Sequence, residues 1–210
     1  METSKLWNSS KESDWRDHLD RYWTFVKASH LAIEKEFDSF DVSVVHDMNK
    51  QECYKFLKNK YFYWKFTAPN RYATTTKHLK KYLGPDDNLD NLYAIKQKLL
   101  QFDKEDIKAG LAIAQQIRGL GIAGASGLLA VLFPKHFATV DQFVVKALSE
   151  VKDLPNKERI TNMNPQQLTI KDGVILISIM RKKATDLNQQ FSTNFWTPRK
   201  VDMVLWGSSR

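Results

Sequence analysis

The segment from residue 118 to residue 141 reads RGLGIAGASGLLAVLFPKHFATVD and decides the fold. Its pattern predicts that one helix ends at Gly119 and that an apolar helix runs from Ile122 to Leu132, before Pro134. Gly119 and Gly121 let the backbone turn tightly between the two helices. The segment therefore predicts a helix, a glycine hairpin, a second helix and a turn that presents Asp141.

The hairpin also predicts an anion site. Amide groups at a helix N-terminus are unpaired, and the helix dipole favours negative charge there, so a nucleic-acid phosphate is a natural occupant. Asp141 adds a lone carboxylate near that backbone. Because aspartate is also a common N-cap residue, we expect Asp141 to begin a helix that reaches Val151. We favour a catalytic role over a role in capping alone, and the two roles are compatible.

These residues resemble the helix-hairpin-helix DNA glycosylases, the superfamily of endonuclease III, the adenine-mismatch glycosylases and the alkyl-base glycosylases. Gly119, Leu120, Gly121 and Ala125 match the hairpin pattern of the family. Asp141 matches its catalytic aspartate at the family's spacing. The likeness covers about residues 103–148 and implies an all-α fold of two lobes, with a central cleft that holds DNA and a flipped base.

The resemblance also implies how the chain divides. Residues 48–135 would form a helical-barrel lobe that ends in the helix-hairpin-helix. Residues 1–47 and 136–210 would form a second helical lobe built from both ends of the chain. The family further implies a monomer that binds double-stranded DNA.

Two positions in the sequence exclude part of the chemistry that the family implies. The lysine nucleophile of bifunctional members falls on Ala123, which has no amine, so Schiff-base chemistry at that position is excluded. Cys53 is the one cysteine, so the four-cysteine iron–sulfur cluster of some members is excluded. We therefore expect a monofunctional glycosylase in which water is the nucleophile and Asp141 stabilises an oxocarbenium-like transition state. The resemblance adds a monovalent cation on the hairpin carbonyls, and we expect no other metal or cofactor.

Candidate DNA contacts follow from the hairpin and from basic residues. Lys135 and His136 lie in the turn before Asp141, although the favoured interpretation of His136 is an ordinary surface histidine. Arg71 and Lys77 share a polar segment with hydroxyl side chains, which suits phosphate contact but also suits a solvated face. The residues expected to contact DNA are Gly119, Gly121, Ile122, Ala123, Gly124, Lys135, His136, Arg71 and Lys77.

Aromatic and basic side chains alternate between Tyr54 and Phe66, a pattern that suits nucleic-acid contact. Lys55, Lys58, Lys60 and Lys65 are the cations of this stretch. Any one of its rings is more readily explained as a core residue. Tyr61 and Trp64 are our candidates for a pocket that stacks the flipped base.

Composition limits the domain organisation, the kind of partner and the cellular compartment that we expect. The chain has 210 residues, 42% of them hydrophobic, and a net charge of +8, which suits one compact unit or two lobes and a polyanionic partner. A single cysteine fits a reducing compartment. The sequence lacks an apolar signal core, a membrane-spanning run, a zinc motif and a nucleotide-triphosphate loop, so we expect a cytoplasmic protein with no membrane partner.

Helical signals recur along the chain and strand signals are sparse. Residues 37–45 alternate and could be a loop or a short strand. Asn49 and Glu52 form a capping-box pattern, and Asp103 is predicted to cap a helix that reaches Arg118. The other expected helices lie about residues 15–31, 70–82, 89–101 and 172–191 and after Thr197-Pro198, with a polar linker over residues 153–169.

Two other functions remain open at this point. One is a helix-hairpin-helix DNA-binding protein that has lost catalysis. The other is an RNA- or protein-interaction domain in which the hairpin only packs. The residues do not reveal which base is removed, nor whether the purpose is DNA repair or defence against phage DNA.

Overall fold

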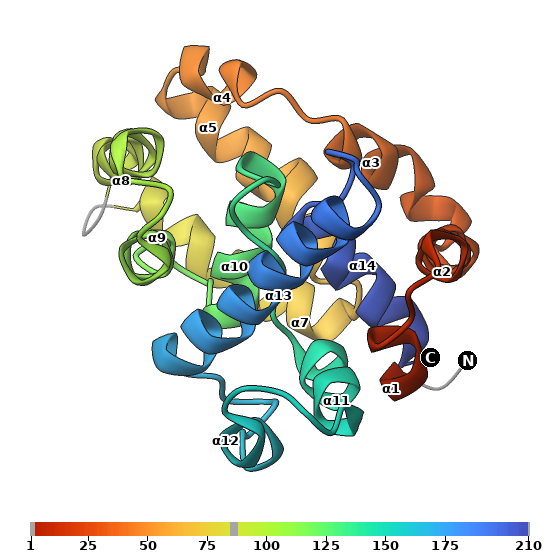
Figure 1. Ribbon diagram of the computed structural model, residues 1–210. Coiled ribbons are helices and arrows are strands. Elements are labelled where there is room, and N and C mark those ends of the chain that lie inside the picture. The colour runs from red at the N-terminus through yellow and green to blue at the C-terminus, as the bar shows by residue number, and fades with distance from the viewer. Residues whose placement is uncertain (1–2, 85–87, 210) are drawn as a thin grey trace.

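The computed structural model describes residues 3–84 and 88–209, and every regular element in those two ranges is helical (Figure 1). The all-α prediction is therefore confirmed. The elements are α1 (Thr3–Trp7), α2 (Glu12–Phe25), α3 (Ala28–Asp38), α4 (Ser43–Asp47), α5 (Lys50–Phe56), the π-helix η1 (Leu57–Tyr61), α6 (Phe62–Lys65), α7 (Pro69–Leu79), the 3-10 helix η2 (Lys80–Leu83), α8 (Leu89–Gln101), α9 (Ile107–Ala114), α10 (Ile122–Leu132), α11 (Gln142–Glu150), α12 (Lys157–Thr161), α13 (Ile170–Gln190) and α14 (Pro198–Ser208).

Several boundaries follow from local capping chemistry, as the sequence predicts. The Asn49 side chain accepts from the amides of Gln51 and Glu52, and the Glu52 carboxylate accepts from the Asn49 amide, which completes the capping box. Thr197 caps α14 with Pro198 at its first position. The helices predicted over residues 89–101 and 122–132 have those bounds.

Four local predictions are corrected. Residues 37–45 form the end of α3, a turn and the start of α4, so the loop alternative holds only for the turn and the strand alternative is wrong. The predicted helix over residues 15–31 breaks between α2 and α3. Asp103 accepts from the Glu105 amide in a turn, and it is Asp106 that caps α9. The predicted linker over residues 153–169 contains α12.

The hairpin helix α10 forms the centre of the molecule. Every residue of α10 except Ala123 is buried, which agrees with a sequence that is apolar on all sides. Helices α9, α13 and α14 contact it, and α13 crosses it in Figure 1. Elements from both predicted lobes thus meet at α10, while the two-lobed arrangement itself stays a prediction.

The run from Lys50 to Lys65 is one continuous helical path whose middle is the π-helix η1. A π turn adds a residue to the helical repeat and so rotates everything after it around the axis. Single π turns inside α-helices are frequent at functional sites.

Candidate functional site

The hairpin turn is built on Gly119. Its φ of +95° lies in the left-handed region, and a Cβ placed on it would lie 2.6 Å from the carbonyl oxygen of Thr75. Only glycine fits both conditions, so the turn lies tightly against α7. Gly121 is the N-cap of α10, and its carbonyl accepts from the Ala125 amide at 2.8 Å.

Asp141 lies at the start of α11 and is partly exposed. Its Oδ1 accepts from the amides of Phe143 at 2.9 Å and Val144 at 3.2 Å, so the predicted cap is present. Its Oδ2 accepts no hydrogen bond from the residues that the structure describes. One oxygen therefore caps the helix, and the other has no hydrogen-bond donor among the described residues.

The turn before Asp141 is fixed by two side chains from other helices. The Val140 amide donates to Ser126 Oγ on α10 at 3.0 Å, and the Thr139 amide donates to Asp202 Oδ2 on α14 at 2.6 Å. Arg199 on α14 also donates to Thr139 Oγ1 at 3.3 Å. The hairpin helix and α14 together therefore determine where the Asp141 carboxylate lies.

A buried ion network lies behind this turn. Arg199 contacts Glu34 on α3 at 2.9 Å and Asp202 at 3.4 Å, and Tyr22 donates to Glu34 at 2.6 Å. Burial disfavours the Asp202 carboxylate and raises its pKa to about 7, against the opposing effect of Arg199. Buried charges of this kind fix geometry because removing either partner leaves the other uncompensated.

The two base-pocket candidates lie in the core. Tyr61 is fully buried and donates its hydroxyl to the Gly124 carbonyl, and Trp64 is buried and donates its indole N–H to Glu34. The Tyr61 hydroxyl and the Trp64 indole N–H thus have hydrogen-bond partners inside the molecule, which agrees with the interpretation of both rings as core residues. In this structure a base has no access to the faces of these rings.

The hairpin residues differ in how far they are exposed to solvent. Gly121 is exposed and Gly119 and Ala123 are partly exposed, whereas Ile122 and Gly124 are buried in the core. The Ile122 side chain therefore cannot touch a ligand here. What the hairpin offers to a phosphate is its backbone at the start of α10.

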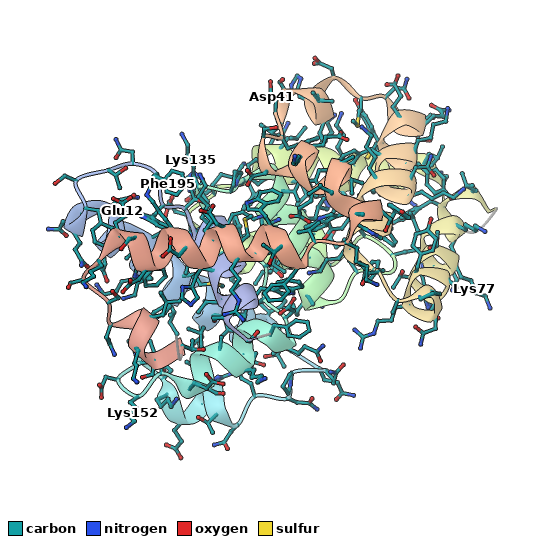
Figure 2. The ribbon with its side chains drawn as sticks, turned by 90° about the vertical axis from the view of Figure 1, so that its right-hand side faces the viewer. Glu12, Asp41, Lys77, Lys135, Lys152 and Phe195 are labelled. Carbon is teal, nitrogen blue, oxygen red and sulfur yellow. The ribbon has the colours of Figure 1, made fainter. Side chains whose placement is uncertain are left out.

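The cationic candidates do not form one cluster. Arg71, Lys77 and Lys135 are all exposed, and Lys77 and Lys135 project from well separated parts of the molecule (Figure 2). His136 pairs with Glu105 at 2.8 Å, and its carbonyl accepts from Arg181.

Arg71 is tied to the neighbourhood of Asp141 by a chain of hydrogen bonds. Its guanidinium donates to Gln166 at 2.8 Å, and Gln166 donates to Gln142 at 2.6 Å. Gln142 is the first residue of α11 and follows Asp141 directly. Arg71 is therefore the predicted DNA contact that the described hydrogen bonds link to the candidate site.

Sequence reasoning did not single out Lys65, Ser126, Arg199 or Asp202. Lys65 belongs to the alternating aromatic and basic stretch, but that pattern does not distinguish it from Lys55, Lys58 or Lys60. The structure distinguishes it, because its aliphatic stem packs against Gly127 of α10. Asp202 and Ser126 act through contacts with residues distant in sequence, which no local pattern reveals.

Two cavities lie away from Asp141. One of about 410 Å³ is lined by residues of α1, α13 and the segment 153–156, and a smaller one of about 20 Å³ lies among apolar side chains of α5, α8 and α10. Over the described ranges, no group of three or more His, Cys, Asp or Glu side chains is placed to hold a metal ion. Within those same ranges, each helix is too short or too polar to cross a membrane.

Comparisons of the chain with protein-family models, with curated proteins and with solved structures found no match. The site has therefore to be interpreted from its own geometry. That geometry consists of a carboxylate with one oxygen that accepts no hydrogen bond from the described residues, a glycine hairpin whose backbone precedes a buried helix, and an arginine that two glutamine side chains link to the start of α11.

Proposed function

We propose that the protein is a DNA N-glycosylase that removes an altered base from double-stranded DNA. The observation that supports this most directly is the free Oδ2 of Asp141, held rigidly at the start of α11. If Asp141 only capped the helix, its position would need no more than local support. Instead, Ser126 and Asp202 fix the preceding turn from two other helices.

Cleavage of the N-glycosidic bond needs one correctly positioned carboxylate. Cleaving an N-glycosidic bond makes the sugar resemble an oxocarbenium cation, which the Asp141 carboxylate would stabilise while it positions the attacking water. The base must first rotate out of the duplex, at a cost of a few kcal/mol for unstacking. Water as the nucleophile leaves an abasic site as the product.

DNA binding would use the backbone at the start of α10 together with Arg71 and the exposed lysines. A helix N-terminus attracts phosphate through its free amides and its dipole. The net charge of +8 favours a polyanion. The monovalent cation expected on the hairpin carbonyls, the monomeric state and the cytoplasmic location belong to this same proposal.

The test is base release from a panel of duplexes, each with one alkylated, deaminated, oxidised or hypermodified base. Free base is measured directly, and abasic sites are revealed by alkali. Wild type should release one class of base, and Asp141→Asn should abolish release while it keeps DNA affinity. Asp20→Asn, at an exposed position on α2, is the matched control and should leave release unchanged.

Other outcomes would contradict the proposal. Salt-dependent duplex binding without base release on any duplex would favour the DNA-binding protein that has lost catalysis. Absence of duplex binding would favour an RNA- or protein-interaction domain. Base release that survives Asp141→Asn would place the catalytic group elsewhere.

A further inference from the structure

The larger cavity, of about 410 Å³, has the size and lining of a small-molecule pocket. It lies between α1, the segment 153–156 and α13. Pockets for small ligands measure about 300–1,000 Å³ and combine a mostly apolar wall with a few polar groups. An apolar wall binds the hydrocarbon part of a ligand because it removes that surface from water. The apolar residues of this wall are Trp7, Leu154, Pro155, Val174, Ile175 and Ile179.

Lys183 of α13 brings an ammonium group to the same cavity. The half-buried side chain donates to the Trp7 carbonyl at 3.0 Å, and its Nζ lies 4.4 Å from the centroid of the Trp7 ring. Over residues 3–84 and 88–209, it makes no other hydrogen bond and no ion pair. Because an ammonium has three N–H donors, two of them have no acceptor among the described residues.

The carboxylates of the cavity do not neutralise Lys183. Asp186 pairs with Lys182 instead, at 3.1 Å, and Asp153 is exposed to water and forms no ion pair with the described residues. Burial lowers the pKa of Lys183 more than the attraction of Asp186 raises it. The charge of Lys183 is therefore uncompensated beside an apolar wall, where a bound anion would stabilise it.

The indole N–H of Trp15 is a second unpaired donor near Lys183. Trp15 is fully buried, and its Nε1 has no acceptor among the described residues. Its ring centroid lies 5.7 Å from Lys183 Nζ and 6.0 Å from the centroid of the Trp7 ring, although Trp15 does not itself line the cavity. Donors therefore outnumber acceptors around Lys183, which suits a ligand that carries acceptor atoms.

We propose that this cavity binds a small amphipathic monocarboxylate, with its carboxylate on Lys183 and its hydrocarbon part against α13 and the segment 153–156. A single negative charge fits because Asp153 and Asp186 line the same cavity and would repel a second anionic group. A purely apolar ligand would leave Lys183 uncompensated. The inference goes beyond the proposed DNA chemistry and does not depend on it, because Asp141 does not line the cavity.

The experiment is isothermal titration calorimetry of the full chain with octanoate, which joins one carboxylate to an unbranched hydrocarbon chain. We expect a Kd below about 1 mM. Octan-1-ol has the same chain without the charge, and octanedioate adds a second carboxylate. Both should bind about tenfold or more weakly than octanoate, because the first cannot pair with Lys183 and the second meets Asp153 and Asp186.

Substitutions test the role of the ammonium. Lys183→Met keeps a stem of similar length without the charge, so it should weaken octanoate binding about tenfold or more and leave the binding of octan-1-ol unchanged. Lys183→Arg keeps the charge and should keep most of the affinity. Lys171→Met, at an exposed position of α13 outside the cavity, is the matched control and should bind octanoate like wild type. The thermal unfolding temperature of each variant shows that it is folded.

A second measurement locates the ligand in the wild-type protein and needs no variant of Lys183. The indole N–H signal of Trp7 in the NMR spectrum, assigned with Trp7→Phe, should shift as octanoate is added. The indole N–H of Trp64 donates to Glu34 in the core, so its signal should stay in place.

Several outcomes would overturn the proposal. They are the absence of octanoate binding below about 1 mM, equally tight binding of octan-1-ol or octanedioate, and full octanoate affinity in folded Lys183→Met. A shift of the Trp64 signal without a shift of the Trp7 signal would also overturn it, because the ligand would then bind elsewhere. Asp141→Asn should leave octanoate affinity unchanged, so this proposal and the glycosylase proposal can fail separately.

Discussion

The two oxygens of Asp141 have different partners, and substitutions can separate their roles. Oδ1 accepts from two amides of α11, whereas Oδ2 is free within the described part of the chain. Asparagine caps a helix about as well as aspartate, because its carbonyl oxygen replaces the capping carboxylate oxygen. Alanine removes both oxygens.

We therefore expect Asp141→Asn to leave the free energy of unfolding nearly unchanged and Asp141→Ala to lower it by about 1 kcal/mol. Both variants should lose base release. Urea denaturation measures the first quantity and the duplex panel the second. If Asp141→Asn destabilised the protein as much as Asp141→Ala, the loss of activity could not be assigned to the carboxylate charge.

At the scale of the element, the hairpin depends on one of its two glycines more than on the other. Gly119 has positive φ and lies against the carbonyl of Thr75, whereas a Cβ on Gly121 would meet nothing within 4 Å. Their places in the sequence pattern look equivalent. In the structure, however, the backbone angle and the close contact restrict Gly119 far more than Gly121.

We expect Gly119→Ala to lower the free energy of unfolding by more than about 2 kcal/mol, because strain at positive φ adds to a steric overlap. Gly121→Ala should cost less than half as much, and its φ of −84° suits alanine. Thermal or urea unfolding of the two variants compares these values directly. Equal losses would mean that the turn can move away from α7 at little cost.

The elements that sequence predicts well are those with unambiguous local ends. Helix α8 begins after the capping Asn88, and α10 lies between Gly121 and the Phe133-Pro134 pair, so both ranges could be predicted. The predicted start of α9 is too early, because Asp103 and Asp106 are both capping residue types and only Asp106 is followed directly by helical residues. Asp141 as an N-cap could be predicted for the same local reason.

The rest of the site could not be predicted because it depends on tertiary contacts. Lys65 is one lysine among several until Gly127 is placed beside it. Asp202 looks like an ordinary helical aspartate until Thr139 donates to it from 63 positions away. The sequence favours Tyr61 and Trp64 as pocket residues because they lie among lysines, whereas both side chains are buried in the core.

At the scale of the whole molecule, the buried ions join elements from both ends of the chain. Glu34 on α3, Arg199 and Asp202 on α14, and the 139–141 turn are connected by hydrogen bonds. Helix α14 also packs along α2. The position of Asp141 is therefore a property of the assembled molecule and not of its own segment.

This network predicts a pH dependence of stability. Because the folded-state pKa of Asp202 is about 7, above its ordinary value of 3.8, the folded protein keeps a proton that the unfolded chain loses. The contribution of Asp202 is therefore fully present below about pH 4 and is lost as the pH rises to about 7.

Asp202→Asn removes this titration and keeps an acceptor for the Thr139 amide. The free energy of unfolding of wild type, minus that of Asp202→Asn, should fall between pH 4 and pH 7. Urea denaturation at several pH values measures it, with Asp20→Asn as the exposed control, for which the difference should stay small. A difference for Asp202→Asn that stays constant over this range would show that Arg199 keeps Asp202 ionised throughout.

The hydrogen bond between Thr139 and Asp202 also has a consequence for synthesis. The acceptor is made 63 residues after the donor, which at about 5–20 residues per second is an interval of roughly 3–13 s. During that time Ser126 already lies upstream in the nascent chain and can hold Val140, but Thr139 has no acceptor on α14. A nascent chain can therefore contain the whole glycine hairpin before the acceptor that fixes the 139–141 turn has been made, and a chain interrupted in this interval would lack the hydrogen bond from Thr139 to Asp202.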